Sequence, residues 1–288
     1  MKSKEFFTVK YEAQDISILV KDFSKDTANL PLLSTEYLYV GYYKPFRQFY
    51  LAFDTLNTEA ATLTFEYYNG SAWVELPAVI DESLNFKRSG FIYFTRPEDW
   101  KAATVESDDN FYIRISSDVD LTPATSLKGL GVLFSNDSDL EAIRSTIVSK
   151  LNNGKSWVEK HEAARKYLIQ QLRNLGHRKV KDRTSQGNSG LFFSNEEKDN
   201  RYYSNLTEFD LLEPFELREA AKYKALSMIY LEELSDEEDD KYFRMGSRHA
   251  KTSDEMFNLF MLKIDKDDDG VEDLEESEGF TGTALVWR

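Results

Sequence analysis

The sequence contains no cysteine, and only three histidines and six prolines occur among its 288 residues. The absence of cysteine excludes disulfide bonds, a thiol nucleophile and cysteine-ligated zinc or iron–sulfur sites. No apolar run approaches the roughly 18 residues that a membrane-spanning helix needs. None follows the N-terminal MKSKEFFTVK either, so we expect neither a membrane span nor a signal peptide.

Positive charge is also scarce, because 36 Lys and Arg residues stand against 51 Asp and Glu residues, for a net charge of −15. General nucleic-acid binding depends on neutralising phosphates, so this excess argues against it. Two interpretations stay open: the charge serves solubility, or it lines a passage in which DNA slides without binding. The single basic stretch, Lys160 to Arg183, is expected to meet the acidic residues 232–240 of the same or a neighbouring subunit. Contact with DNA is the alternative.

The motifs of common catalytic sites are missing. The sequence has no GxSxG, GxxxxGK[ST], GxGxxG or HExxH. His161, His177 and His249 are scattered and are expected to be surface or packing residues. Acidic runs such as EELSDEEDD indicate a solvated face. We therefore predict no enzyme, no catalytic residue and no cofactor.

One segment resembles a calcium-binding loop. Asp265, Asp267, Asp269, Gly270 and Glu276 occupy positions 1, 3, 5, 6 and 12 of the EF-hand template. Position 8 is a glutamate where the template places an apolar residue, and SEGFTGTALVWR is a poor exiting helix. Calcium binding therefore stays open, and we assign no metal site.

Residues 1–135 have the pattern of an antiparallel β-sandwich. Short apolar runs recur between turn residues: FFTVKY, ISILV, YLYVGYY, FRQFYLAF, ATLTFEYY, FIYF, FYIRISS and LGVLF. Asn69-Gly70 predicts a two-residue hairpin turn. Trp73 and Trp100 are expected to anchor the core or its rim.

Aromatic residues are dense in one part of this region. They are Tyr37, Tyr39, Tyr42, Tyr43, Phe46, Phe49, Tyr50 and Phe53. One interpretation places alternate members in the core and the rest against a neighbouring subunit. The other makes them a stacking platform for carbohydrate.

From residue 136 the pattern becomes helical. Ser135 to Ser138 can serve as linker and N-cap. Three helices are expected to follow: one with the apolar stripe Leu140, Ile143, Ile147 and Leu151, one from the Ser156/Glu159 capping box to Gly176, and one from Pro214 with the stripe Leu217, Ala220, Ala221, Ala225, Met228 and Leu231. Residues 177–208 are expected to be a long loop. After an acidic corner, a last helix carries Tyr242, Met245, Met256, Phe257, Phe260 and Met261 and ends at Asp265.

These patterns predict an α+β protein: an antiparallel β-sandwich over residues 1–135, an α-helical bundle over 136–270, and an extended C-terminal tail over 271–288. The tail holds a short apolar run of Ala284, Leu285, Val286 and Trp287 before Arg288. An isolated strand is not stable alone, so we expect this run to pair with a sheet edge or fill a groove. The partner is either another protein or the chain's own domain.

The helical region resembles a known family. LLEPFELREAAKYKALSMIYLEEL, the acidic turn, the tyrosine-containing helix and IDKDDDG resemble the helical core of the head-to-tail adaptor (connector) proteins of tailed bacteriophages. DLEAIRSTIVSKL and WVEKHEAARKYLIQQLRNLG resemble the earlier helices of that core. The resemblance covers about half of the chain and consists of packing patterns. The segment YNGSAWVELPAVIDES…FKRSGFIYFTRPEDW resembles small β-sandwich modules of phage tail and other virion proteins.

The resemblance implies a structural virion protein in the viral neck, assembled in the host cytoplasm. It implies a ring of twelve copies that joins the portal protein to a tail, stopper or tail-terminator protein. The ring would continue the channel for double-stranded DNA without sequence recognition, and Ala284, Leu285, Val286, Trp287 and Arg288 would dock on the portal. A rival interpretation is a carbohydrate- or surface-binding β-sandwich module on a helical stalk.

Overall fold

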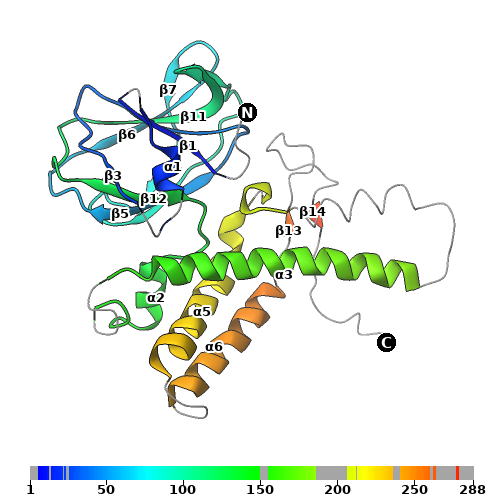
Figure 1. Cartoon of the computed structure of the whole chain (residues 1–288). Helices are drawn as coiled ribbons and strands as arrows, with labels where there is room; N and C mark the ends of the chain where they lie inside the picture. Colours follow the sequence, from blue (N-terminus) through cyan, green and yellow to red (C-terminus); the bar gives the residue numbers. More distant parts are fainter. Residues whose placement is uncertain are drawn as a thin grey trace. The chain divides into compact units, whose positions relative to one another are not determined.

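The computed structural model describes residues 6–12, 14–21, 23, 26–149, 155–185, 206–211, 213–235, 241–259, 262–263 and 277–278. Contacts group the described residues up to Leu133 into one compact unit and those from Phe134 into a second. The first unit holds large antiparallel sheets and the second holds most of the helices (Figure 1). The predicted α+β class is confirmed.

The N-terminal unit contains a seven-stranded antiparallel sheet in the order β2-β1-β4-β11-β6-β7, with β10 paired to β11. Its strands are β1 (Thr8–Tyr11), β2 (Gln14–Asp15), β4 (Leu38–Tyr42), β6 (Leu63–Tyr68), β7 (Trp73–Glu75), β10 (Ala103–Val105) and β11 (Asp108–Ser117).

Side chains alternate between the two faces of this sheet, as the pleat requires. One face is apolar and buried; it carries Val9, Tyr11, Leu38, Val40, Tyr42, Leu63, Phe65, Tyr67, Ile113 and Ile115. The opposite face, which we call the outer face, carries polar and aromatic residues. Gly41 on this face leaves room for Tyr112, its neighbour across the β4–β11 pair. A Cβ at Gly41 would lie only 2.2 Å from the Tyr112 ring.

A five-stranded antiparallel sheet completes the N-terminal unit, in the order β3-β12-β5-β9-β8. Its strands are β3 (Ala28–Asn29), β5 (Gln48–Thr55), β8 (Ile80–Asp81), β9 (Gly90–Tyr93) and β12 (Ser126–Gly131). All residues from Gln48 to Phe53 are buried, so both faces of β5 are covered. Phe23 contacts Tyr50 with 6.1 Å between ring centroids, and Phe49 contacts Phe7 at 6.3 Å.

Two local predictions for this unit were wrong in detail. ISILV was expected as a strand but contains the short helix α1 (Ser17–Val20), because Asp15 Oδ1 accepts the Ser17 N–H at its start, 2.9 Å away. The β6–β7 hairpin exists, but its loop spans residues 69–72 instead of two residues. Asn69 Oδ1 accepts the N–H groups of Ser71 and Ala72, and Gly70 has a φ of 99°. The side chain of Asn69 thus stabilises a longer turn.

The C-terminal unit is mainly helical. Its elements are α2 (Asp137–Ile143), α3 (Val158–Ser185), the 3₁₀ turns η1 (Glu208–Asp210) and η2 (Pro214–Leu217), α5 (Arg218–Met228), the π-helical turn η3 (Ile229–Leu234), α6 (Lys241–Phe257) and the antiparallel pair β13 (Leu262–Lys263) and β14 (Ser277–Glu278).

Helices α5 and α6 pack as an antiparallel pair (Figure 1). Ser253 near the end of α6 donates to the Ala220 carbonyl near the start of α5, with 2.8 Å between oxygens. At the other end of the pair, Tyr242 stacks on Tyr230 with 6.2 Å between ring centroids. Gly246 lets the two backbones approach, because a Cβ there would lie 2.6 Å from Leu231 Cγ. The core of this unit consists of Leu140, Ile147, Trp157, Ala164, Ala225, Leu226, Ile229 and Tyr230.

Two earlier helices differ from their predictions. The helix predicted from the stripe Leu140 to Leu151 ends at Ile143, whose side chain is exposed. Ile147 is buried, but it belongs to the turn that follows this helix. Leu151 lies outside the described residues. Helix α3 continues past Gly176 to Ser185, so the beginning of the predicted loop 177–208 is helical. A single glycine costs about 1 kcal/mol in a helix and does not end one without a competing cap.

The helix predicted from Pro214 also changes character. It begins as 3₁₀, continues as α5, and ends as a π-helical turn. The π turn adds a residue to the repeat. Ile229 and Tyr230 are therefore buried, while the predicted stripe residues Met228 and Leu231 are only half-buried. Helix α6 ends at Phe257 and not at Asp265; Phe260, Met261 and Asp265 lie outside the described residues.

Candidate functional site

A buried polar network stands at the start of the helical unit. Ser135 Oγ lies 2.8 Å from His161 Nδ1, and His161 Nε2 lies 3.2 Å from Asp137 Oδ1. Asp137 Oδ1 also accepts the Trp157 N–H at 3.0 Å. Beside it, Asn136 caps α2 in a reciprocal capping box with Asp139, which confirms the N-cap predicted in this polar cluster.

The order serine–histidine–aspartate resembles a nucleophile with its base and orienting acid. The serine is fully buried, and the histidine is 1% exposed. A nucleophile must be reachable by its substrate. The network therefore joins the start of α2 to the start of α3 and has a structural role. The prediction that His161 is a packing residue is consistent with this position.

The network sets the ionisation of Asp137. Burial alone would raise the pKa of Asp137, but the hydrogen bond and charge of His161, the Ser156 hydroxyl and the Trp157 N–H together hold it below its usual value of 3.8. A carboxyl with a lowered pKa stabilises the fold above its unfolded pKa, and this stabilisation is lost as pH falls through the folded value. The helical unit should thus lose stability as pH falls below about 4.

Asp137→Asn should lower the free energy of unfolding by about 2 kcal/mol at pH 7, because it weakens three hydrogen bonds of a mostly buried acceptor. The measurement is urea unfolding of the full chain, followed by circular dichroism at the helix band, between pH 7 and pH 3. The variant should also show a shallower loss of stability in acid. Asp120→Asn is a matched control, since the pKa of Asp120 is lowered by Ser34 in the other unit. If the variant lost stability in acid as steeply as the wild type, Asp137 would not be the source of this pH dependence.

The basic residues of α3 are engaged within the chain. Lys160 Nζ pairs with Glu232 at 2.8 Å and Glu233 at 2.6 Å. Burial would lower the pKa of Lys160, but these two carboxylates raise it instead. Arg165 pairs with Glu208 at 2.6 Å. The expectation that the basic stretch meets residues 232–240 is confirmed for Lys160, and the contact lies within one chain.

The predicted aromatic platform is divided between core and surface. Tyr42, Phe49, Tyr50 and Phe53 are buried. Phe46 contacts Phe7, Phe49, Phe94 and Trp100 in the same core. Half-buried Tyr43 contacts Tyr42 with 4.6 Å between ring centroids. The single eight-residue platform was therefore wrong, and its members on the outer face are Tyr37 and Tyr39.

Sequence reasoning missed the residues that join this pair. The Arg114 guanidinium carbon lies 4.4 Å from the Tyr37 ring centroid and 4.7 Å from that of Trp73. Trp73 contacts Tyr39 at 5.8 Å and Tyr68 at 5.7 Å. We call Tyr37, Tyr39, Tyr68, Trp73 and Arg114 the aromatic cluster. The period-two spacing of Tyr37 and Tyr39 indicated a shared face, but the partners come from β6, β7 and β11 and needed the sheet order.

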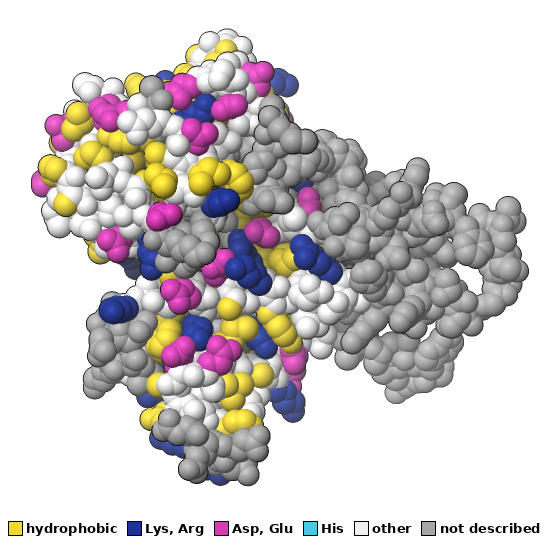
Figure 2. Space-filling view, in the orientation of Figure 1, with side chains coloured by type: hydrophobic (Ala, Val, Ile, Leu, Met, Phe, Trp, Pro, Cys, Tyr) yellow, Lys and Arg dark blue, Asp and Glu magenta, His cyan; other side chains and the backbone are white. Residues whose placement is uncertain are grey.

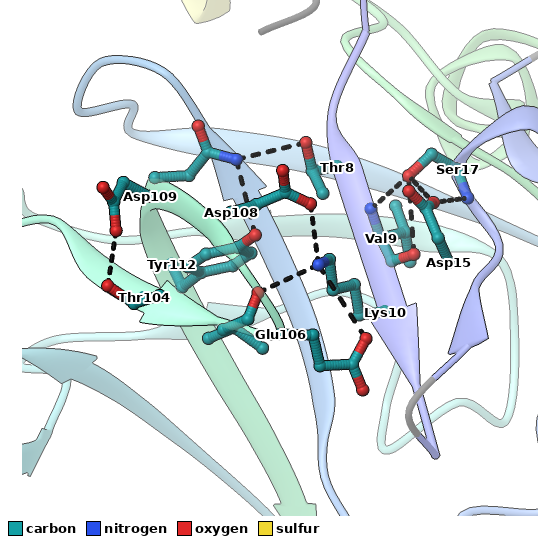
Figure 3. A network of polar contacts seen from close by, with 12 residues as sticks. Thr8, Val9, Lys10, Asp15, Ser17, Thr104, Glu106, Asp108, Asp109 and Tyr112 are labelled. Carbon is teal, nitrogen blue, oxygen red and sulfur yellow. Dashed lines mark hydrogen bonds and ion pairs between the residues drawn. The ribbon is translucent and has the colours of Figure 1, made fainter. Parts of the chain in front are cut away.

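A polar network borders the aromatic cluster on β1. Lys10 is buried and donates to the Val105 carbonyl at 2.9 Å, and it pairs with Asp108 at 2.7 Å (Figure 3). Asn110 bonds Thr8 and the Tyr112 hydroxyl at 3.2 and 3.4 Å. The charge of Lys10 is therefore used inside the fold.

The remaining predicted site residues lie outside the described residues. They are the portal-docking residues Ala284, Leu285, Val286, Trp287 and Arg288 and the calcium-loop residues Asp265, Asp267, Asp269 and Glu276. Among the residues that the structure describes, no group of His, Cys, Asp or Glu could hold a metal ion. In the same residues, no helix is both long and apolar enough to cross a membrane.

No protein-family model and no curated protein matches this chain.

Proposed function

We propose that the protein is a structural virion component, a head-to-tail adaptor that forms a ring between the portal and the tail and continues the DNA channel. Its parts are an N-terminal β-sandwich, an α-helical bundle and an extended C-terminal tail. The twelvefold ring, the neck location, and the portal and tail partners rest on the resemblance of the helical sequence to phage adaptors.

The observation that carries the proposal is the close antiparallel packing of α5 and α6. Gly246 and Ser253 are buried at this contact, and the Ser253 hydroxyl donates to a carbonyl of the opposite helix. Small residues let helices approach closely and form a stiff wall element. The contact lies in the segment that resembles the adaptor core, so local packing and resemblance support the same role.

The polar groups of the helical unit support a structural role. Ser135 and His161 are buried, and Lys160 and Arg165 of α3 pair with carboxylates of their own chain. On the face shown in Figure 2, acidic and basic side chains are interspersed. The net charge of the chain, −15, would repel phosphates and let a duplex slide.

The proposal is tested by binding to the portal protein of the same virus. The full chain should bind the portal and form a ring visible by electron microscopy. A chain truncated after Glu278, and full-length Trp287→Ala, should bind at least about tenfold more weakly, because strand pairing and an aromatic anchor are lost.

Phe215→Ala is a matched control for Trp287→Ala, since it removes an exposed aromatic ring of the helical unit. It should leave portal binding unchanged. Undiminished binding by the truncated chain would move the docking surface away from the tail and keep the adaptor. No binding by either chain would overturn the adaptor proposal.

A further inference from the structure

The outer face of the seven-stranded sheet has an unusual composition. Its positions on β1, β4, β6, β7 and β11 carry no aliphatic side chain; they are Thr8, Lys10, Tyr39, Gly41, Thr64, Glu66, Tyr68, Trp73, Glu75, Asp108, Asn110, Tyr112, Arg114 and Ser116. Four of them, Lys10, Gly41, Asn110 and Tyr112, are buried. The apolar surface of this face is therefore aromatic. The aromatic cluster forms its centre, with Tyr37 38% exposed and Tyr39, Tyr68 and Trp73 half-buried.

The cluster is held in one arrangement before any ligand arrives. Arg114 contacts the rings of both Tyr37 and Trp73 and bonds Glu66 Oε2 through Nε and Nη2, each at 2.8 Å. Tyr68 donates to the Gly70 carbonyl at 3.1 Å. Ligand binding would therefore cost little side-chain entropy, because these side chains are already ordered.

Polar groups lie between the rings. Both contacts of Arg114 use Oε2 of Glu66, which leaves Oε1 available to a hydroxyl donor as far as the described residues show. Planar guanidinium and carboxylate groups bind paired hydroxyls, and aromatic faces pack against the C–H groups of a sugar ring. Tyr, Trp and Arg are also enriched in protein interfaces, so the preference for a sugar rests on the hydroxyl-accepting oxygen of Glu66 and not on the aromatic rings alone.

The charges on this face favour a neutral ligand over an anionic one. Glu75 is exposed, and the side chains of Asp108 and Glu66 are 48% and 19% exposed. Lys10 is paired with Asp108, and Arg114 is paired with Glu66. No described cation of these positions is left for an anionic ligand, so acidic sugars and phosphates are disfavoured.

We propose that the aromatic cluster binds a neutral glycan, with a pyranose ring packed on Tyr37 and Trp73 and its hydroxyls bonded to Glu66 and Arg114. The site belongs to the N-terminal unit alone and needs neither the ring nor the portal. Its failure and the failure of the adaptor proposal are therefore distinguishable, because sugar binding and portal binding are measured separately.

The test uses the full chain with methyl glycosides of glucose, galactose, mannose and N-acetylglucosamine, and with their neutral disaccharides. Ligand-detected NMR saturation transfer and tryptophan fluorescence are the measurements. At least one neutral sugar should bind with a dissociation constant on the order of 1 mM. Its uronic-acid counterpart should bind about tenfold more weakly because of the carboxylates.

Variants locate the site. Tyr37→Ala, Trp73→Ala and Glu66→Gln should each weaken the sugar by about tenfold or more, whereas Phe215→Ala should leave binding unchanged. Each variant must have the near-UV circular dichroism spectrum of the wild type, which shows that it is folded. Absence of transfer from every neutral sugar overturns the proposal, as does binding that all three variants retain. Preferential binding of the uronic acids would also overturn it.

Discussion

Gly90→Ala is expected to lower the free energy of unfolding of the N-terminal unit by about 3 kcal/mol. A Cβ at this position would lie 2.6 Å from the carbonyl carbon and oxygen of Glu82 and 2.7 Å from the Ser83 nitrogen. These are backbone atoms, so no rotation of a side chain can relieve the overlap. Either β9 or the segment that follows β8 must move.

That segment has little freedom to move. The Glu82 N–H bonds the Phe91 carbonyl at 2.9 Å, and Asp81 accepts hydrogen bonds from Ser83 and Asn85. Leu84, Asn85 and Phe86 then follow with φ values of 54°, 59° and 65°. Three consecutive left-handed residues without glycine are costly, and they persist because the surrounding bonds fix them. Displacing Glu82 would disturb all of these contacts.

The measurement is urea unfolding followed by near-UV circular dichroism, which reports on the packed aromatic side chains of this unit. Gly131→Ala is the matched control on β12. Its Cβ would lie 3.1 Å from the tip of the Phe23 ring, a side-chain atom that has to move by only a few tenths of an ångström, so the loss should stay below about 1 kcal/mol. If both variants lost the same free energy of unfolding, the contact between Gly90 and the Glu82 backbone would not be the reason that position 90 requires glycine.

The sequence predicted the features of the sheet that depend on local pattern. Alternation along YLYVGYY and ATLTFEYY indicates which residues share a face, and β4 and β6 follow it. The aromatic cluster could not be predicted in this way, because it needs Arg114 beside Glu66 and Tyr39. That neighbourhood is set by the order β4-β11-β6, in which strands distant in sequence pair. Sheet order depends on long-range packing, which a single sequence does not display.

The helical unit shows the opposite limit. Apolar spacing predicted α3, α5 and α6 but not their ends or the π turn. A helix ends where tertiary contacts offer its backbone groups better partners, and propensity is a weak guide to that point. The Ser135–His161–Asp137 network was missed because its members are separated in sequence and match no motif. Its only local signal was the capping sequence around Asn136.

The π turn places Tyr230 in the core of the helical unit. Tyr230 is 1% exposed, and it stacks on His249 with 5.4 Å between centroids as well as on Tyr242. Arg144 Nη1 donates to its hydroxyl at 2.5 Å, and the guanidinium lies 5.6 Å from its ring centroid. Tyr230 therefore links α6 to the end of α2 across the end of α5.

Tyr230→Ala should lower the free energy of unfolding of the helical unit by about 4 kcal/mol, since it leaves a cavity and removes both stacks. Tyr230→Phe keeps the ring and loses only the hydroxyl bond, so about 1 kcal/mol is expected. Urea unfolding of the full chain at the helix band measures both. Similar losses for the two variants would mean that the hydroxyl bond, and not the ring packing, stabilises this corner.

The ionisation of His249 gives an independent readout of the same stack. Burial, with a smaller contribution from the nearby Arg248 charge, lowers the pKa of His249. A histidine with a lowered pKa takes up its proton more readily when unfolded, so it costs stability as pH falls below its unfolded pKa of about 6.5. Tyr230→Ala should expose the imidazole and return its pKa toward the ordinary value in an NMR titration, whereas Tyr230→Phe should keep it low. An unchanged titration in the alanine variant would show that other side chains bury His249 and that Tyr230 acts on stability alone.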